Sequence, residues 1–360
     1  MSKGIFQSGV KKFFRPEVFS VEAYPAGELP RACVRVCANE NSRGVSPKAL
    51  AAMTDALVRA NRYPDSRCTL LRKKLAQKWN LDPDGIIVGN GLDGAFTMLG
   101  RAFFAPGDEV VCSDLTFGVY ADTAKIMGAT PIQVPVTDTL EQDADGFVAA
   151  MSPRTKMVVC CNPNNPTGAV MKRSDVMKIL SAAPESAIVL FDEAYIEYAD
   201  DCVSGLEFLA DYPNVMVCRT FSKLYGLAGV RLGWVAARPE LIEPMYRVRE
   251  PFCVTDIAAA GAAAALDDEE YAALSRRETV AERERFCSFL GQQNIPFVPS
   301  QTNFVCVRLA EKSEMVLKGL AERGIYVRAA GCRGEKLLRI SLGTPEENRS
   351  IEQAIAEILA

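Results

Sequence analysis

Short apolar runs alternate with helical segments along most of this chain, and that alternation constrains its fold more than any other feature. Helical patterns such as 119–128 and 173–184 lie between runs that have the apolar character of buried strands. These runs cover residues 110–112, 131–136, 156–162, 187–195, 214–222 and 232–237. Nearly continuous apolar strands separated by helices predict a mostly parallel sheet covered on both faces, and therefore an α/β fold.

The pattern changes after about residue 240, where a charged helical region at 266–291 leads to a compact tail. A last helix is predicted from the capping box of Thr344 and Glu347. Before it, the tail has strand and helix patterns at 302–309, 314–324 and 336–342. Strands and helices mixed in this way predict a second, smaller α+β domain.

Composition and charge exclude several functions. The 360 residues are 49% hydrophobic and 24% charged with a net charge of −4, which argues against a nucleic-acid groove. No apolar run reaches the roughly 18 residues of a membrane span, and residues 1–19 lack the apolar core of a signal peptide. The twelve cysteines are scattered without a C-x-x-C pair, so disulfides and a zinc site are not expected. We therefore expect a cytoplasmic protein without a metal, a membrane anchor or a nucleic-acid partner.

The chain contains no histidine, which limits its chemistry sharply. Ser-His-Asp catalysis, Cys-His catalysis and histidine-ligated metals are excluded. Any proton transfer must use Lys, Asp, Glu, Tyr or Cys. A bound cofactor that carries the difficult chemistry is therefore attractive.

Residues 89–94, GNGLDG, follow an apolar strand pattern and precede a helical one. The G-x-G-x-x-G spacing is typical of dinucleotide-binding loops, and Asp114 ends the next strand pattern about twenty residues further on. Backbone N–H groups at a helix N-terminus also bind other phosphates. The loop alone leaves open a nicotinamide or flavin enzyme and an enzyme with a different phosphate-bearing cofactor.

Three further stretches follow apolar strand patterns: NPNNPTG at 162–168, DEAYIEY at 192–198 and TFSKLYGLAGVRLGW at 220–234. Each alone is compatible with a turn, a solvated acidic loop or a surface lysine. In a doubly wound sheet, ligands bind outside the carboxyl ends of the strands, where all three would meet the glycine loop. A lysine that forms a Schiff base, an aspartate that keeps a pyridine nitrogen protonated and an anion-binding loop suit pyridoxal phosphate. The nicotinamide interpretation leaves the three stretches without a role.

Together with ANEN (38–41), RYPD (62–65), LTFGVY (115–120) and LRISLGT (338–344), these stretches resemble the histidinol-phosphate aminotransferase family. The resemblance covers nearly the whole chain and implies a fold-type I pyridoxal-phosphate-dependent transferase. Its large domain, at 39–279, would have a mostly parallel seven-stranded sheet sandwiched by helices. Residues 280–360 would form the small α+β domain, with residues 1–38 packing against it. The resemblance also implies a homodimer with shared active sites.

The same resemblance assigns roles to individual residues. Lys223 would form the Schiff base and move the proton, and Asp192 would pair with the pyridine nitrogen. Tyr195 and Asn165 would hold the phenolic oxygen, and Phe117 falls where an aromatic ring stacks on the cofactor. The residues implied to bind the cofactor phosphate are Gly91, Leu92, Asp93, Thr220, Ser222, Arg231 and, from the other chain, Tyr63.

The family's substrate site is matched as well. Arg328 and Arg339 match two arginines that bind the phosphate of histidinol phosphate, and Tyr24 and Asn165 belong to the same site. Arginine suits this task because it binds phosphate oxygens in a bidentate manner. The implied reaction moves an amino group from a small-molecule donor, histidinol phosphate, to a 2-oxo acid, 2-oxoglutarate.

Other functions stay open on the sequence. Arg339 also falls where relatives bind an α-carboxylate, so an aromatic or other amino acid is an alternative donor, and decarboxylation of threonine phosphate is another. A non-catalytic cofactor-binding regulator usually adds a helix-turn-helix domain, for which the N-terminal segment has no room. The chain departs from the family at Ser42 and Arg43 and at 250–256. Arg43 would either meet a more acidic substrate or face water.

Overall fold

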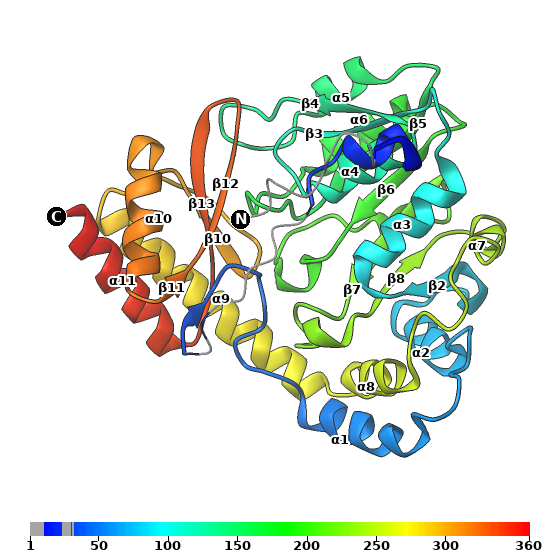
Figure 1. Ribbon diagram of the computed structural model, residues 1–360, viewed down its shortest axis with the longest axis horizontal. Helices are drawn as coiled ribbons and strands as arrows, with labels where there is room; N and C mark the ends of the chain where they lie inside the picture. The colour runs from blue at the N-terminus through cyan, green and yellow to red at the C-terminus, as the bar shows by residue number, and fades with distance from the viewer. Residues whose placement is uncertain (1–10, 24–29, 31) are drawn as a thin grey trace.

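The computed structural model describes residues 11–23, 30 and 32–360, and its large domain is a sheet between two layers of helices (Figure 1). The sheet has seven strands in the order β2-β8-β7-β6-β5-β3-β4. Only β8 runs antiparallel to its neighbours, so the other six strands point the same way. The bounds are β2 Ile86–Gly89, β3 Glu109–Ser113, β4 Thr130–Val134, β5 Thr155–Cys161, β6 Ile188–Asp192, β7 Val215–Thr220 and β8 Gly233–Ala236. The mostly parallel seven-stranded sheet is confirmed.

Helices cover both faces of this sheet because successive side chains of a strand point to opposite sides. On β5, Val158 and Cys160 pack against α5 and α6, whereas Met157 and Val159 pack against α3 and α4. Helices α1, α2 and α8 pack against the β2–β8 end of the sheet. The helices are α1 Pro47–Ala56, α2 Thr69–Trp79, α3 Gly91–Phe103, α4 Val119–Ile126, α5 Ala144–Ala150, α6 Arg173–Ala182, α7 Pro239–Met245 and α8 Asp256–Leu266.

The small domain has a four-stranded antiparallel sheet in the order β12-β13-β10-β9. Helices α10 and α11 and the end of α9 supply the other half of its core. Thr344 and Glu347 form the predicted capping box at the start of α11, with N–H to oxygen distances of 2.7 and 3.2 Å. The elements are α9 Glu269–Gln292, β9 Phe297–Val298, β10 Phe304–Val307, α10 Ser313–Glu322, β12 Arg328–Cys332, β13 Glu335–Ser341 and α11 Pro345–Leu359. A division at 279/280 falls inside α9, which is one continuous helix.

The N-terminal segment contacts both domains. Strand β1 (Val34–Arg35) pairs in parallel with β11 (Ile325–Tyr326) beside the small domain. The short helix η2 (Pro16–Phe19) instead lies against α4 of the large domain. Arg15 donates a hydrogen bond to the Ile126 carbonyl at the end of α4, 3.3 Å away. A cation is favourable at a helix C-terminus, so this contact suits the end of α4.

Short 3-10 helices complete the described chain: η1 Lys11–Phe13, η3 Leu57–Arg59, η4 Pro83–Gly85, η5 Ile196–Tyr198, η6 Gly205–Phe208, η7 Ala228–Val230 and η8 Ala310–Lys312. In the described ranges, no helix is both long enough and apolar enough to cross a membrane. All twelve cysteines lie in these ranges as free thiols.

Candidate active site

The predicted site residues gather at one edge of the large sheet. Because β2, β5, β6 and β7 run in the same direction, their carboxyl ends lie together, and the loops that follow them start there. Gly89 ends β2, Asp192 ends β6 and Thr220 ends β7. The antiparallel strand β8 begins at this edge with Gly233, two residues after Arg231. The topology therefore brings the glycine loop, the aspartate and the Ser222-Lys223 segment to one place.

The glycine loop forms an anion-binding cradle. Gly91 begins α3 with φ +69°, and Asn90 before it makes no side-chain cap, so the first N–H groups of the helix are available to a ligand. Arg231, itself in the left-handed region, places Nη2 2.9 Å from Asp93 Oδ2. A Cβ atom at Gly91 would collide with the Arg231 guanidinium. This cradle suits a phosphate group.

Thr220 and Ser222 are buried near the end of β7, where the Thr220 hydroxyl accepts the Ser222 N–H at 3.1 Å. Leu92, which was also predicted to bind the cofactor phosphate, packs its side chain into the core beside the cradle.

Lys223 has the properties of a nucleophilic amine. Burial lowers its pKa to about 8, and the charges of Arg339 and Arg231 lower it as well. Its Nζ donates to the Ala38 carbonyl at 3.2 Å and lies 5.6 Å from the centre of the Tyr195 ring. A fraction of the amine is therefore unprotonated near neutral pH, as Schiff-base chemistry requires.

Asp192 is a buried carboxylate held by two donors. Its Oδ1 accepts the Ala194 N–H at 3.0 Å and its Oδ2 accepts the Tyr120 hydroxyl at 2.5 Å. Burial raises the pKa of Asp192 to about 6, although both hydrogen bonds lower it. The group is still mainly ionised at pH 7.

Tyr195 and Arg339 connect the two domains at the site. The Tyr195 hydroxyl accepts a hydrogen bond from Asn39 Nδ2 at 2.9 Å, and burial raises the Tyr195 pKa to about 12. Arg339 donates through Nη1 to Asn165 Oδ1 and through Nη2 to the Cys37 carbonyl, both at 2.6 Å. Among the described residues, its buried Nε has no partner. Arg339 can therefore donate a further hydrogen bond to an anionic group.

Arg328 lies beside Arg339, and Phe117 lies among aromatic side chains. Arg328 on β12 is the direct partner of Arg339 on β13, and its side chain is exposed. Phe117 is partly buried and packs edge-on against Phe96 and Tyr120, with centroid distances of 6.5 and 5.9 Å.

Two residues discussed from the sequence, Tyr63 and Arg43, lie elsewhere, and a third is not among the described residues. Tyr63 is 82% exposed on the surface and stacks on Phe252. Tyr24 falls outside the described residues. Arg43 forms an ion pair with Glu278 on α9, so its positive charge is balanced within the protein.

Sequence reasoning missed Asn39, Asn41 and Tyr120 as site residues. Asn41 Nδ2 donates to the Leu224 carbonyl at 2.7 Å and so fixes the segment that carries Lys223. All three residues lie in the ANEN and LTFGVY stretches, whose resemblance to a family was the available signal. Their partners are remote in sequence, so local pattern gave them no role.

A nucleophilic amine, a buried carboxylate and a phosphate cradle at one sheet edge fit the requirements of pyridoxal phosphate. The cradle that a Gly91 side chain would fill is the structural observation that supports this fit.

Comparisons with known proteins agree with the geometry. Residues 31–355 match the family model for class I and II aminotransferases. A histidinol-phosphate aminotransferase from Symbiobacterium thermophilum is 37% identical over 327 residues, covering 91% of this chain and 90% of the relative. Histidinol-phosphate aminotransferase 2 from Pseudomonas aeruginosa is 39% identical, with coverage of 92% and 90%. The crystal structure of histidinol-phosphate aminotransferase from Sinorhizobium meliloti in complex with pyridoxal-5'-phosphate has a TM-score of 0.89 and 29% identity, covering 96% of this chain and 97% of that one.

Proposed function

Since the chain belongs to the class I and II aminotransferase family and is a pyridoxal-phosphate-dependent aminotransferase, we propose that its amino donor is histidinol phosphate. The acceptor would be 2-oxoglutarate, and the reaction would serve histidine biosynthesis. The relatives that carry this name match more than nine-tenths of the chain, which supports the proposal.

The pairing of Arg328 with Arg339 is the observation that supports histidinol phosphate as the substrate. Residues directly opposite each other in an antiparallel ladder project to the same face, so Arg328 projects from the face on which Arg339 reaches Asn165. Burial lowers the pKa of Arg339, and the charge of Arg328 lowers it further. Two neighbouring cations favour a strongly anionic group, and a phosphoester carries roughly −1.5 to −2 charges at pH 7.

The cofactor, when bound, supplies an electron sink beside the bond that breaks. The N-terminus of α3 and Arg231 bind its phosphate, with the hydroxyl groups of Thr220 and Ser222 at the adjoining end of β7. Asp192 would keep the ring nitrogen protonated. Tyr195 and Asn165 would hold the phenolic oxygen.

Lys223 is the base and the acid of the reaction. Its Nζ would take and return the proton that the reaction moves, because a pKa of about 8 lets the amine act both as a base and as an acid near neutral pH. This assignment explains how a chain without histidine moves a proton.

Replacing Arg328 tests the substrate. In Arg328→Gln, kcat/KM for histidinol phosphate should fall roughly 10- to 100-fold, as expected for one charge-assisted hydrogen bond, while the half-reaction with glutamate changes little. The control is Arg323→Gln on the outer side of the small domain, where the arginine faces Glu357. An equal loss with both donors would contradict the substrate, and carbon dioxide release from threonine phosphate would identify the decarboxylase instead.

The proposal includes a homodimer in which Tyr63 reaches the partner's cofactor phosphate. Exposed apolar side chains on α1, η3 and α2 support the proposal of a dimer. They are Leu50, Leu57, Val58 and Leu70. Such patches on a monomer mark interaction sites.

Mixing two impaired variants tests the dimer. A hybrid of Tyr63→Ala and Lys223→Ala chains contains one site with both residues intact, so the mixture should regain activity that neither variant has alone. A monomer in sedimentation velocity, or no regain of activity, would contradict shared sites.

A cytoplasmic location is part of the same proposal. Twelve free thiols, several of them buried in the core, fit a reducing compartment. Fractionation of cells that express the protein would test it.

A further inference from the structure

Tyr120 makes a buried hydrogen bond to the carboxylate on which the cofactor chemistry depends. Its hydroxyl lies 2.5 Å from Asp192 Oδ2, and the two residues are only 3% and 2% exposed. We infer that Tyr120 is a positioning residue for the reaction, because its O–H keeps the Asp192 carboxylate ionised and oriented for the ring nitrogen. This inference rests on the proposed function, since it deepens the role of Asp192.

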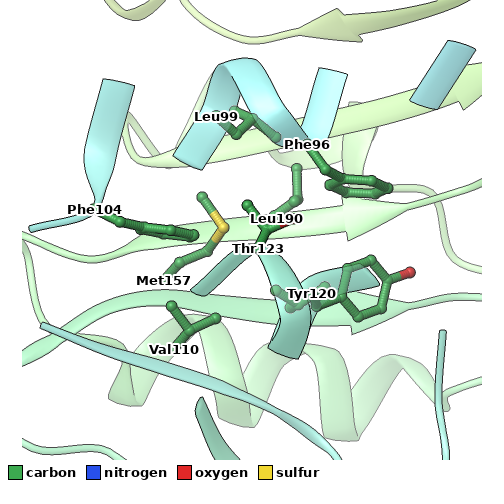
Figure 2. A pocket seen from close by; sticks show the side chains of 9 residues that line it. Phe96, Leu99, Phe104, Val110, Tyr120, Thr123, Met157 and Leu190 are labelled. Atoms are coloured by element: carbon green, nitrogen blue, oxygen red, sulfur yellow. The ribbon is translucent and has the colours of Figure 1, made fainter. Parts of the chain in front are cut away.

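The surroundings fix the Tyr120 ring. It packs edge-on against Phe96 and Phe117, at centroid distances of 5.0 and 5.9 Å. The ring also lines a void of about 10 Å³, and Figure 2 shows the Tyr120 hydroxyl pointing away from it. Among the described residues, Thr123 is the one other polar side chain that lines this void. The residues around the void therefore offer the Tyr120 hydroxyl few alternative hydrogen-bond partners to Asp192.

Hydrogen bonds are what keep Asp192 charged. Burial raises its pKa, and the nearby charges of Glu193 and Asp93 raise it too, whereas the bonds from Tyr120 and the Ala194 N–H lower it. The titratable groups that face Asp192 are Tyr120 on α4, Cys161 on β5, Cys218 on β7, Asp93 on α3, and Glu193 and Tyr195 in the following turn. None of these groups is a cation that could replace the Tyr120 donor.

The consequence for the chemistry follows from proton sharing. A carboxylate that accepts a strong hydrogen bond is a weaker base. With Tyr120 in place, Asp192 would leave the shared proton on the ring nitrogen. Without the hydroxyl, Asp192 would draw that proton toward itself, and the ring would be a poorer electron sink.

The first test uses the protein without cofactor. Infrared titration should show that Tyr120→Phe raises the pKa of Asp192 by roughly one to two pH units. The Asp192→Asn variant identifies the absorption band of the Asp192 carboxylate. The matched control is Tyr198→Phe, because Tyr198 is fully buried and its hydroxyl has no partner among the described residues. An unchanged Asp192 pKa in Tyr120→Phe overturns the inference.

The second test uses the holoenzyme and separates positioning from a structural role. In Tyr120→Phe, the ¹⁵N signal of ring-labelled cofactor should move toward the unprotonated value, and kcat should fall roughly 10-fold or more with little change in KM. In an Asp192→Asn background, the same change should have almost no further effect. An equal loss of kcat in Tyr198→Phe, or full additivity with Asp192→Asn, overturns the inference. A protein that takes up no pyridoxal phosphate refutes the proposed function, while the titration without cofactor still decides the role of Tyr120.

Discussion

Gly91→Ala tests the phosphate cradle because two separate effects can be distinguished there. Gly91 has φ +69°, which strains any residue with a Cβ atom, and its Cβ would also collide with the Arg231 guanidinium. Gly324 provides the matched control. It has φ +74°, and a Cβ placed on it meets nothing within 4 Å.

The magnitudes follow from these geometries. Both substitutions should destabilise the fold by roughly 1–2 kcal/mol, the strain of a left-handed non-glycine residue. Only Gly91→Ala displaces Arg231. Loss of a charge-assisted hydrogen bond to a phosphate is worth about 1.5–3 kcal/mol, so cofactor binding should weaken roughly 10- to 100-fold in that variant alone.

Urea unfolding of both variants without cofactor measures the first effect, and titration with pyridoxal phosphate followed by absorbance measures the second. We expect similar losses of unfolding free energy and a loss of affinity only in Gly91→Ala. Wild-type cofactor affinity in Gly91→Ala would refute the cradle, and an equal loss of affinity in Gly324→Ala would show that the effect is global destabilisation.

Three further predictions follow from buried groups. Between pH 8 and 10.5 the unfolded chain binds a proton at Lys223 that the folded chain does not. The unfolding free energy of the cofactor-free wild type should therefore rise relative to that of Lys223→Met as pH rises through that range. The same difference between the two proteins at pH 8 and at pH 10 would contradict this. Arg219→Met should cost about 3–5 kcal/mol in urea unfolding because it leaves Glu193 buried without its cation, whereas Arg173→Met, from an exposed pair with Glu207, should cost under about 1 kcal/mol; similar losses in the two variants would disprove the difference. Asp192→Ala should retain cofactor yet lose most of kcat, as measured by steady-state kinetics, and wild-type kinetics would mean that the carboxylate is misplaced.

Local signals in the sequence predicted the elements and the edge at which the site forms. Apolar runs mark the buried strands, and the helical patterns at 119–128 and 173–184 are α4, Val119–Ile126, and α6, Arg173–Ala182. Because parallel strands end at a common edge, Asp192 at the end of β6 and Lys223 in the loop after β7 could be assigned to one site. The family resemblance then supplied their roles.

Contacts between distant segments could not be predicted in this way. The Ser341 hydroxyl donates to Asn39 Oδ1 across 302 residues of sequence, and Asn39 in turn donates to Tyr195. These partners depend on how the small domain lies against the large one, which hydrophobic periodicity does not encode. The contact of residues 16–19 with α4 likewise joins segments that are remote in sequence.

The visible spectrum of the purified protein tests the central claim most directly. With pyridoxal phosphate added, the protein should show the absorption of lysine-bound cofactor, lose it on addition of histidinol phosphate, and regain it with 2-oxoglutarate. Phenylalanine and phosphothreonine should leave it largely unchanged. A response only to one of those donors would contradict the proposed substrate, and no absorption band from lysine-bound cofactor at all would contradict the account as a whole.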